Sequence, residues 1–244
     1  MTVSIVGVGI QIISTTLWWI GIYIVLRTLD VKVSSKRFIA IIAGVLLWGW
    51  FLLASMLGSQ GFFNVTGSTL PKIPLTVLVT LIIGFAFLFS ATFKKMLRAF
   101  PMHWLIGIQV FRVLGVVFLL RYAQGTLPGV FAIPAGIGDF ITGITAPFVA
   151  YWYYKQKPWS RGIAIIWNIF GIADLVNALA IGILSSPTLR VIVAEPPVQL
   201  IFPLLLIPTV AVPRYILLHA YTLWLLRKKK TTSFIATGFK PPTS

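Results

Sequence analysis

The sequence predicts an all-α fold: a polytopic membrane helical bundle of seven transmembrane helices, with the N-terminus outside and the C-terminus cytoplasmic. Of the 244 residues, 58% are hydrophobic and only 10% are charged, which is more apolar surface than one water-soluble core can bury. The apolar residues form runs of about 20, the length that crosses a bilayer. Short basic clusters separate these runs, as in a membrane protein whose loops set its orientation.

Seven apolar runs are long enough to span a membrane: 3–26, 38–57, 75–92, 102–120, 128–153, 162–184 and 198–226. The last run is too long for one straight helix, and Pro203, Pro208 and Pro213 predict kinks within it. No stretch is left for a soluble domain, so residues 1–244 form one transmembrane domain. Its last part, 228–244, is expected to be a flexible cytoplasmic tail.

The basic residues predict the orientation. Fifteen Lys and Arg residues fall in the first, third and fifth connections and the tail, against Lys72, Arg121 and Arg190 on the other side. The positive-inside rule places the richer side in the cytoplasm of a multi-pass protein of the plasma membrane or bacterial inner membrane. These clusters could also bind anionic lipid head groups. Because topology accounts for the positive charge, nucleic acid is not expected as a partner.

Residue usage excludes several classes of site. The chain has no cysteine, so it has no disulfide or thiolate metal site, and its two histidines cannot fill a zinc site alone. It also lacks a Walker loop, an H-E-x-x-H or G-x-S-x-G motif and a potassium-filter sequence. ATP-driven transport by this chain alone is therefore excluded, no catalytic set is found, and no cofactor is expected.

The layout of seven helices with an external N-terminus resembles that of the microbial rhodopsins. That resemblance implies retinal bound to a lysine in the last helix. No lysine lies in any predicted span here, and the last span instead holds Arg214 and His219. A guanidinium stays protonated and forms no Schiff base, so retinal is not expected.

Four charged residues fall deep inside predicted spans: Arg112, Asp139, Asp174 and Arg214. A central charge costs about 2.5 to 3.5 kcal/mol to insert, so we expect these four to be paired. Arg112 and Asp139 lie at similar depth on helices joined by a short loop, which predicts an ion pair between them. By the same count of depth, Asp174 is predicted to pair with Arg214.

Polar residues near these charges extend the candidate site. Gln109, Thr142 and Asn177 each lie three residues from a buried charge, on the same helical face. Asn168 is half a turn round its helix from Asn177 and is not expected to join. His219 is a candidate proton acceptor or gate. The predicted substrate or ion path thus comprises Arg112, Asp139, Asp174, Arg214, Gln109, Thr142, Asn177 and His219.

The fifth span contains Pro134, Gly136 and Gly138 just before Asp139. One interpretation is a broken helix, which transporters use to hold ions and substrates. The other is close helix packing over Gly136 and Gly143, which lie seven residues apart.

His103 and His219 are together a candidate pair of haem ligands. His103 begins its span, whereas His219 lies eight residues inside its own, a difference in depth of about 10 Å. His103 is therefore expected at the membrane interface, apart from Arg112.

Three functional interpretations follow. The first is a carrier or channel for a small polar or anionic solute, with coupling to protons through Asp139 and a water-accessible cavity near Arg112. The second is a seven-helix ligand-sensing or assembly protein with structural ion pairs, a dry core and a partner at the cytoplasmic loops. The third is an intramembrane enzyme or haem protein that uses His219 and a bound cofactor.

Overall fold

The computed structural model describes residues 2–64, 72–187 and 189–228, and it is 80% helical, with no strand among the described residues. The predicted all-α class is therefore confirmed. The long helices begin and end close to the limits of the apolar runs, because these runs alone supply enough apolar surface to face lipid on one side and protein on the other.

Six helical segments of the described chain are long and apolar enough to cross a membrane. Large apolar side chains lie on their outer faces, among them Val45, Ile82 and Ile166, which are 60 to 70% exposed. Outward apolar surface of this kind is typical of a multi-pass membrane protein. The segments are α1 (Thr2–Thr28), α2 (Val33–Ser59), α3 (Lys72–Ala86) with η1 (Phe87–Phe89), the composite of α5 (Met102–Gly107), η2 (Ile108–Gly115) and α6 (Val116–Ala123), α7 (Gly129–Tyr154), and α8 (Ser160–Leu184).

The last predicted span is only partly helical. Its first residues, from Val198 to Leu205, are not helical, and the helical run consists of the π-helical η3 (Ile207–Ala211) followed by α9 (Val212–Lys228). The predicted start of this span at Val198 is therefore wrong. The physical reason is that Pro203 lacks a backbone N–H and so opposes helix in the segment before η3.

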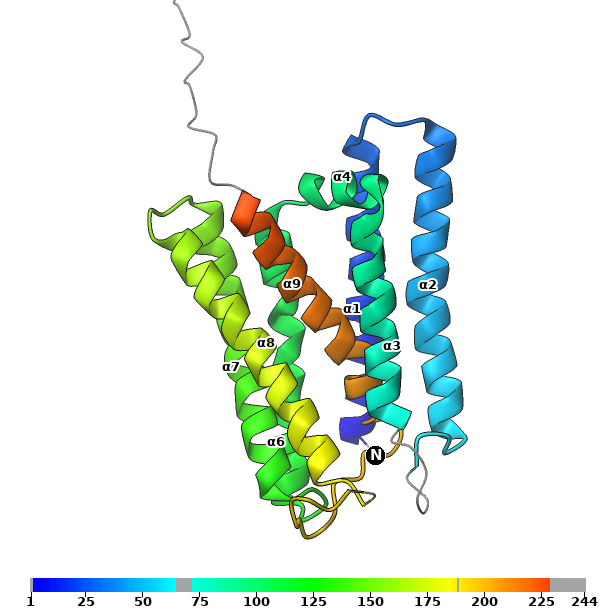
Figure 1. Cartoon of the computed structure of the whole chain (residues 1–244), viewed down its shortest axis with the longest axis vertical. Helices are drawn as coiled ribbons and strands as arrows, with labels where there is room; N and C mark the ends of the chain where they lie inside the picture. Colours follow the sequence, from blue (N-terminus) through cyan, green and yellow to red (C-terminus); the bar gives the residue numbers. More distant parts are fainter. Residues whose placement is uncertain (1, 65–71, 188, 229–244) are drawn as a thin grey trace, which may run out of the picture.

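A short amphipathic helix, α4 (Ala91–Ala99), was not predicted. Its first turn is capped by the side chain of Ser90, which accepts a hydrogen bond from the backbone N–H of Phe93. It buries Met96 and Leu97, and it lies across one end of the bundle in Figure 1. Nine residues are too few to register as a span, which is why apolar-run counting missed it.

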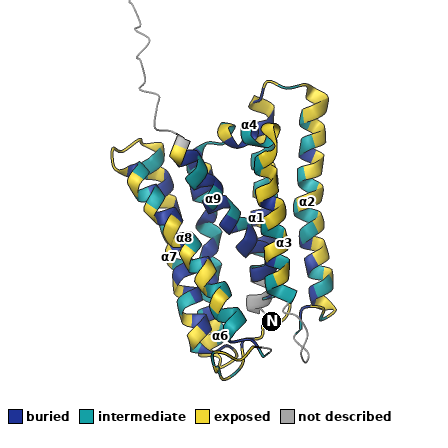
Figure 2. Cartoon of the chain, viewed as in Figure 1, coloured by how far each residue is buried: buried dark blue, intermediate teal, exposed yellow. Residues whose placement is uncertain are grey.

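Helix α7 packs against α5, η2, α6 and α8. Half of its spanning window is buried, compared with 17% for α2 at the periphery, and this contrast is visible in Figure 2. The candidate site is therefore expected where α7 meets η2 and α8.

Of the two interpretations of the fifth span, the broken helix is wrong, because α7 is one continuous α-helix that contains Pro134 and Pro147. Its glycines instead permit close packing. A Cβ at Gly143 would lie 2.3 Å from the backbone nitrogen of Val113, and one at Gly136 would lie 3.1 Å from the carbonyl oxygen of Gly115. The irregular backbone is on the other side of this contact, in the 3-10 segment η2 that carries Arg112.

The two ends of the bundle differ in charge. The α1–α2 and α7–α8 connections, α4 and the last turn of α9 lie at one end, which we call the basic end, whereas α1 begins at the opposite end (Figure 1). The predicted flexible tail lies outside the described residues from position 229 onward. The described basic residues at the basic end are Arg27, Lys32, Lys36, Arg37, Lys94, Lys95, Arg98, Lys155, Lys157, Arg161, Arg227 and Lys228.

Candidate functional site

The guanidinium of Arg112 is the centre of a buried polar cluster. Its Nε donates to Oδ1 of Asp139 at 2.7 Å, which confirms the predicted ion pair, and its Nη2 donates to Oδ2 of Asp174 at 2.5 Å. The side chain of Arg112 is fully buried, and those of Asp139 and Asp174 are less than one-tenth exposed. One guanidinium is therefore shared by two carboxylates, one from α7 and one from α8.

Glycines bring these side chains together. A Cβ at Gly115 on η2 would lie 2.2 Å from Cβ of Asp139, and one at Gly138 on α7 would lie 1.7 Å from Oδ1 of Asp174. Only glycine leaves room for a carboxylate at either place. The three helices thus approach closely because the residues facing each acid have no side chain.

The third nitrogen of the Arg112 guanidinium, Nη1, contacts residues of α8 and α9. Nη1 lies 2.9 Å from Nε2 of His219 and 3.3 Å from the carbonyl oxygen of Gly171. On the other side of the ring, Nδ1 of His219 lies 2.8 Å from Oδ1 of Asn168. Together with Gln109, whose amide nitrogen is 3.1 Å from Nδ1, these residues form a cluster in which Gln109, Asn168 and His219 are buried.

The hydrogen bonds fix the tautomer of His219. A guanidinium has donors only, so Nε2 must accept from Arg112, and the ring proton must lie on Nδ1. Nδ1 then donates to Oδ1 of Asn168, whose own amide nitrogen donates to the carbonyl of Ala164 at 2.6 Å. The opposite orientation of the Gln109 amide would point its Oε1, otherwise without a hydrogen bond, at Nδ1. His219 is thus a neutral acceptor for Arg112.

The predicted pair of Asp174 with Arg214 is wrong. Arg214 donates from Nη1 to Oγ1 of Thr15 on α1 at 3.0 Å, whereas Asp174 pairs with Arg112. The reason is rotation about the axis of α9. Arg214 is five residues from His219, or about 140° round the helix, so it points away from Arg112 when His219 points toward it. Depth alone could not distinguish these faces.

Of the other predicted site residues, some lie in the cluster and others do not. Gln109 and His219 lie in the cluster, and Thr142 is buried but donates its hydroxyl to the carbonyl of Gly138 on its own helix. Asn177 is exposed on α8, so its predicted place beside Asp174 is wrong, and Asn168 occupies the cluster instead. The two asparagines do lie on opposite faces, as predicted, but the face that turns inward is that of Asn168.

The prediction that Asn168 lies outside the site is wrong, and Gly171 was not predicted as a contributor. Asn168 and Gly171 could have been found from their spacing of three residues on α8. This spacing places the amide of Asn168 on the same helical face as a residue without a side chain. His103 lies apart from the cluster, as predicted. It is partly exposed, and its ring packs against Tyr154 with 4.9 Å between ring centroids.

A small cavity adjoins the acid side of the cluster. It has a volume of about 10 Å³, and its walls include Gln11, Arg112, Gly115, Asp139 and Tyr215. This volume is near the lower limit for one water molecule, so it cannot hold an organic solute. Among the described residues, no group of three or more His, Asp or Glu side chains is arranged to hold a metal ion.

The comparisons with known proteins identify a family without a described function. A family described as a domain of unknown function (DUF8737) matches residues 72–227, more than half of the chain, and the chain belongs to it. No curated protein and no solved structure matches. The matched region contains Arg112, Asp139, Asp174 and His219, whereas α1 and α2 precede it.

Proposed function

We propose that this member of the DUF8737 family is a proton-coupled membrane carrier for a small polar or anionic solute, and that the cluster around Arg112 binds the proton. The observation that carries the proposal is the sharing of one guanidinium between Asp139 and Asp174. Transport, the solute and the plasma or bacterial inner membrane as its location are all parts of this proposal.

Charge balance supports a proton site. With His219 neutral, two ionised carboxylates against one guanidinium leave one negative charge in excess inside the membrane. An uncompensated central charge costs about 2.5 to 3.5 kcal/mol. A proton on either Asp139 or Asp174 makes the cluster neutral, so the cluster has one place for a proton.

Competition for Arg112 would couple that proton to a solute. Every arm of the guanidinium is engaged by a protein acceptor in this arrangement. Protonation of one aspartate weakens its hold on Arg112 and frees donors that match a carboxylate or phosphate in geometry. By linkage, an anion bound to Arg112 favours protonation of that aspartate by the same factor.

The arrangement corresponds to an occluded form of such a carrier. The adjoining cavity has room for about one water molecule, so a solute needs a wider conformation. The 3-10 segment η2 is the element that we assign to this change. Its hydrogen bonds are weaker than those of an α-helix, and it carries both Arg112 and Gly115 of the site.

We also infer seven crossings, with the N-terminus outside and the C-terminus in the cytoplasm. The seventh is the run from Ile207 through α9 to Lys228, which is about 33 Å long at 1.5 Å per residue. Its last turn and the other basic connections share one end of the bundle, which the positive-inside rule places in the cytoplasm (Figure 1).

The test uses purified protein in liposomes that contain a pH-sensitive dye, to which a panel of small carboxylates and organic phosphates is added. We expect at least one anion to drive proton movement in the unmodified protein and not in Asp139→Asn or Asp174→Asn. Asp30→Asn is the matched control, because Asp30 lies between α1 and α2, outside the spans. No response to any anion, or an equal response from all three variants, would refute the proposal.

A structural role for the cluster is the second candidate, favoured by the small volume of the cavity and by the fully engaged guanidinium. It predicts that Asp139→Asn changes stability and never proton movement. The haem alternative has less support, since both ring nitrogens of His219 are engaged by Arg112 and Asn168.

A further inference from the structure

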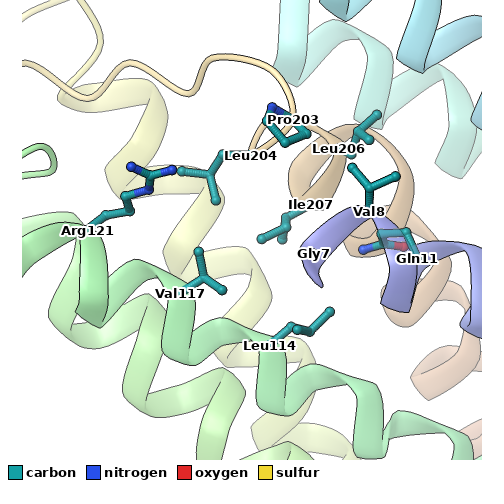
Figure 3. Close-up of a pocket in the computed structure, with 10 residues that line it drawn as sticks. All are labelled: Gly7, Val8, Gln11, Leu114, Val117, Arg121, Pro203, Leu204, Leu206 and Ile207. Carbon is teal, nitrogen blue, oxygen red and sulfur yellow. The ribbon is translucent and has the colours of Figure 1, made fainter. Parts of the chain in front are cut away.

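A second cavity lies on the side of the cluster that faces away from the basic end. It has a volume of about 20 Å³ and is drawn in Figure 3. Arg121, at the last turn of α6, lines it at one end, and the side chains of Val117 and Leu114 follow along the same helical segment. Gly7 and Val8 of α1 close the opposite wall.

This outer cavity and the cavity beside Asp139 adjoin each other. Gln11, Leu114 and Ile207 line both of them. The shared residues come from α1, η2 and η3, so the two cavities meet where these three elements converge. The combined space leads from Arg121 to the carboxylate of Asp139.

Gln11 is the polar residue on the wall between the cavities. It is only 4% exposed, and it lines both cavities. A buried polar side chain on the wall of a cavity with room for water commonly hydrogen-bonds to that water. The position of Gln11 therefore indicates water between the two cavities.

The cluster is closed toward the basic end. The ring of Trp167 packs on His219 with 5.2 Å between ring centroids, and Ile106, Ala146 and Leu218 belong to the same buried apolar group. Access to Asp139 is therefore asymmetric: apolar side chains cover it on one side, and a polar residue and free space lie on the other.

We propose that the two cavities are the closed form of one aqueous route, which runs from the end of the bundle where α1 begins to Asp139. The side chain of Gln11 hydrogen-bonds to water along this route. Arg121 at its mouth makes the route selective for small anions over small cations. This inference rests on the proposed function for its purpose, but its geometry can be tested without any transport.

Cysteine labelling tests the route, because the native chain has no cysteine. Leu114→Cys lies on the wall shared by the cavities. Ile137→Cys is the matched control: Ile137 is 44% exposed on the outer face of α7, and its neighbour Gly136 contacts the backbone of Gly115 at the depth of Leu114. Val117→Cys, nearer the mouth, provides a second position if Leu114→Cys fails to fold.

The reagent is the membrane-impermeant anion 2-sulfonatoethyl methanethiosulfonate, added to one side of reconstituted vesicles at a time. We expect Leu114→Cys to react about tenfold faster than Ile137→Cys, since thiolate forms only where water solvates it. The reaction should occur from the side where α1 begins. Equal rates at the two positions, or reaction only from the basic end, would overturn the route.

Two further variants test its parts. Arg121→Gln should remove the preference for the anionic reagent over its trimethylammonium analogue, and Gln11→Leu should slow labelling at Leu114→Cys but not at Val117→Cys. An unchanged reagent preference or an unchanged rate would contradict the role of that residue. Labelling measures access alone, so a failed proton assay with successful labelling rejects the proposed function and leaves the route intact.

Discussion

At the scale of single residues, the cluster holds two carboxylates and one guanidinium. The charge that remains therefore depends on whether an aspartate or the arginine is removed. Arg112 bonds to both Asp139 and Asp174, and its single positive charge balances only one of the two carboxylates. Removal of an aspartate leaves one charge of each sign, and removal of the arginine leaves two carboxylates without a cation. The two kinds of substitution therefore differ in cost.

We predict that Arg112→Gln destabilises the protein by about 3 to 5 kcal/mol, the usual cost of a buried charge stripped of its partner. Asp139→Asn should cost less, about 1 to 2 kcal/mol, because Asp174 still balances Arg112. Denaturant titration of the purified protein in detergent measures both values. A cost for Asp139→Asn as large as that for Arg112→Gln would mean that Asp174 does not share the guanidinium.

The sequence identifies the buried charges because each is expensive in lipid, and depth along the helices is enough to pair Arg112 with Asp139. Depth could not pair Asp174, since Arg112 and Arg214 lie at comparable depth and differ in rotation about their helix axes. Rotation is set by packing between helices. For the same reason, periodicity showed that Asn168 and Asn177 face opposite ways without showing which one faces the core.

At the scale of elements, the contact between α7 and its neighbours depends on glycine, and the irregular backbone lies in η2. Proline and glycine in the fifth span were compatible with either a broken helix or close packing, and the structure shows a continuous α7 beside the 3-10 segment η2. Residues in a helix can alter the conformation of its neighbour by letting the two backbones approach, as Gly143 does at Val113. Sequence patterns within one span do not contain that information.

We predict that Gly138→Ala disrupts the cluster. The added methyl group would lie 1.7 Å from Oδ1 of Asp174, so the carboxylate must leave its place on Arg112, at an expected cost of about 1 to 3 kcal/mol. Gly49→Ala on α2 is the control, because a Cβ there meets nothing within 4 Å. In a helix it should be neutral or stabilising by up to about 1 kcal/mol. Thermal unfolding followed by tryptophan fluorescence compares the two, and equal midpoints would show that α7 and α8 are not in this close contact.

At the scale of the whole molecule, the distribution of charge agrees with the path of the chain. Four separate parts of the sequence lie at the basic end, and each carries Lys or Arg (Figure 1). The apolar runs predicted six spanning helices of the structure closely, since hydrocarbon thickness dictates their length. The short helix α4 and the late start of the last helical run were missed, because neither a nine-residue helix nor a proline-rich apolar segment is distinguished by mean hydropathy.

The seventh crossing and the orientation of the bundle can be tested together. α9 begins near the centre of the bundle after η3 and ends at the basic end, whereas α1 begins at the opposite end (Figure 1). If η3 and α9 complete a crossing, the chain crosses an odd number of times and its two termini lie on opposite sides. A reporter that is active only in the cytoplasm should then work when fused after Ser244 and fail when placed after Gly61, in the connection between α2 and α3 at the end away from the basic residues. Activity at both positions, or at Gly61 alone, would contradict the predicted orientation, because the connection after α2 and the end of α9 would no longer lie on the two sides that the basic residues assign to them.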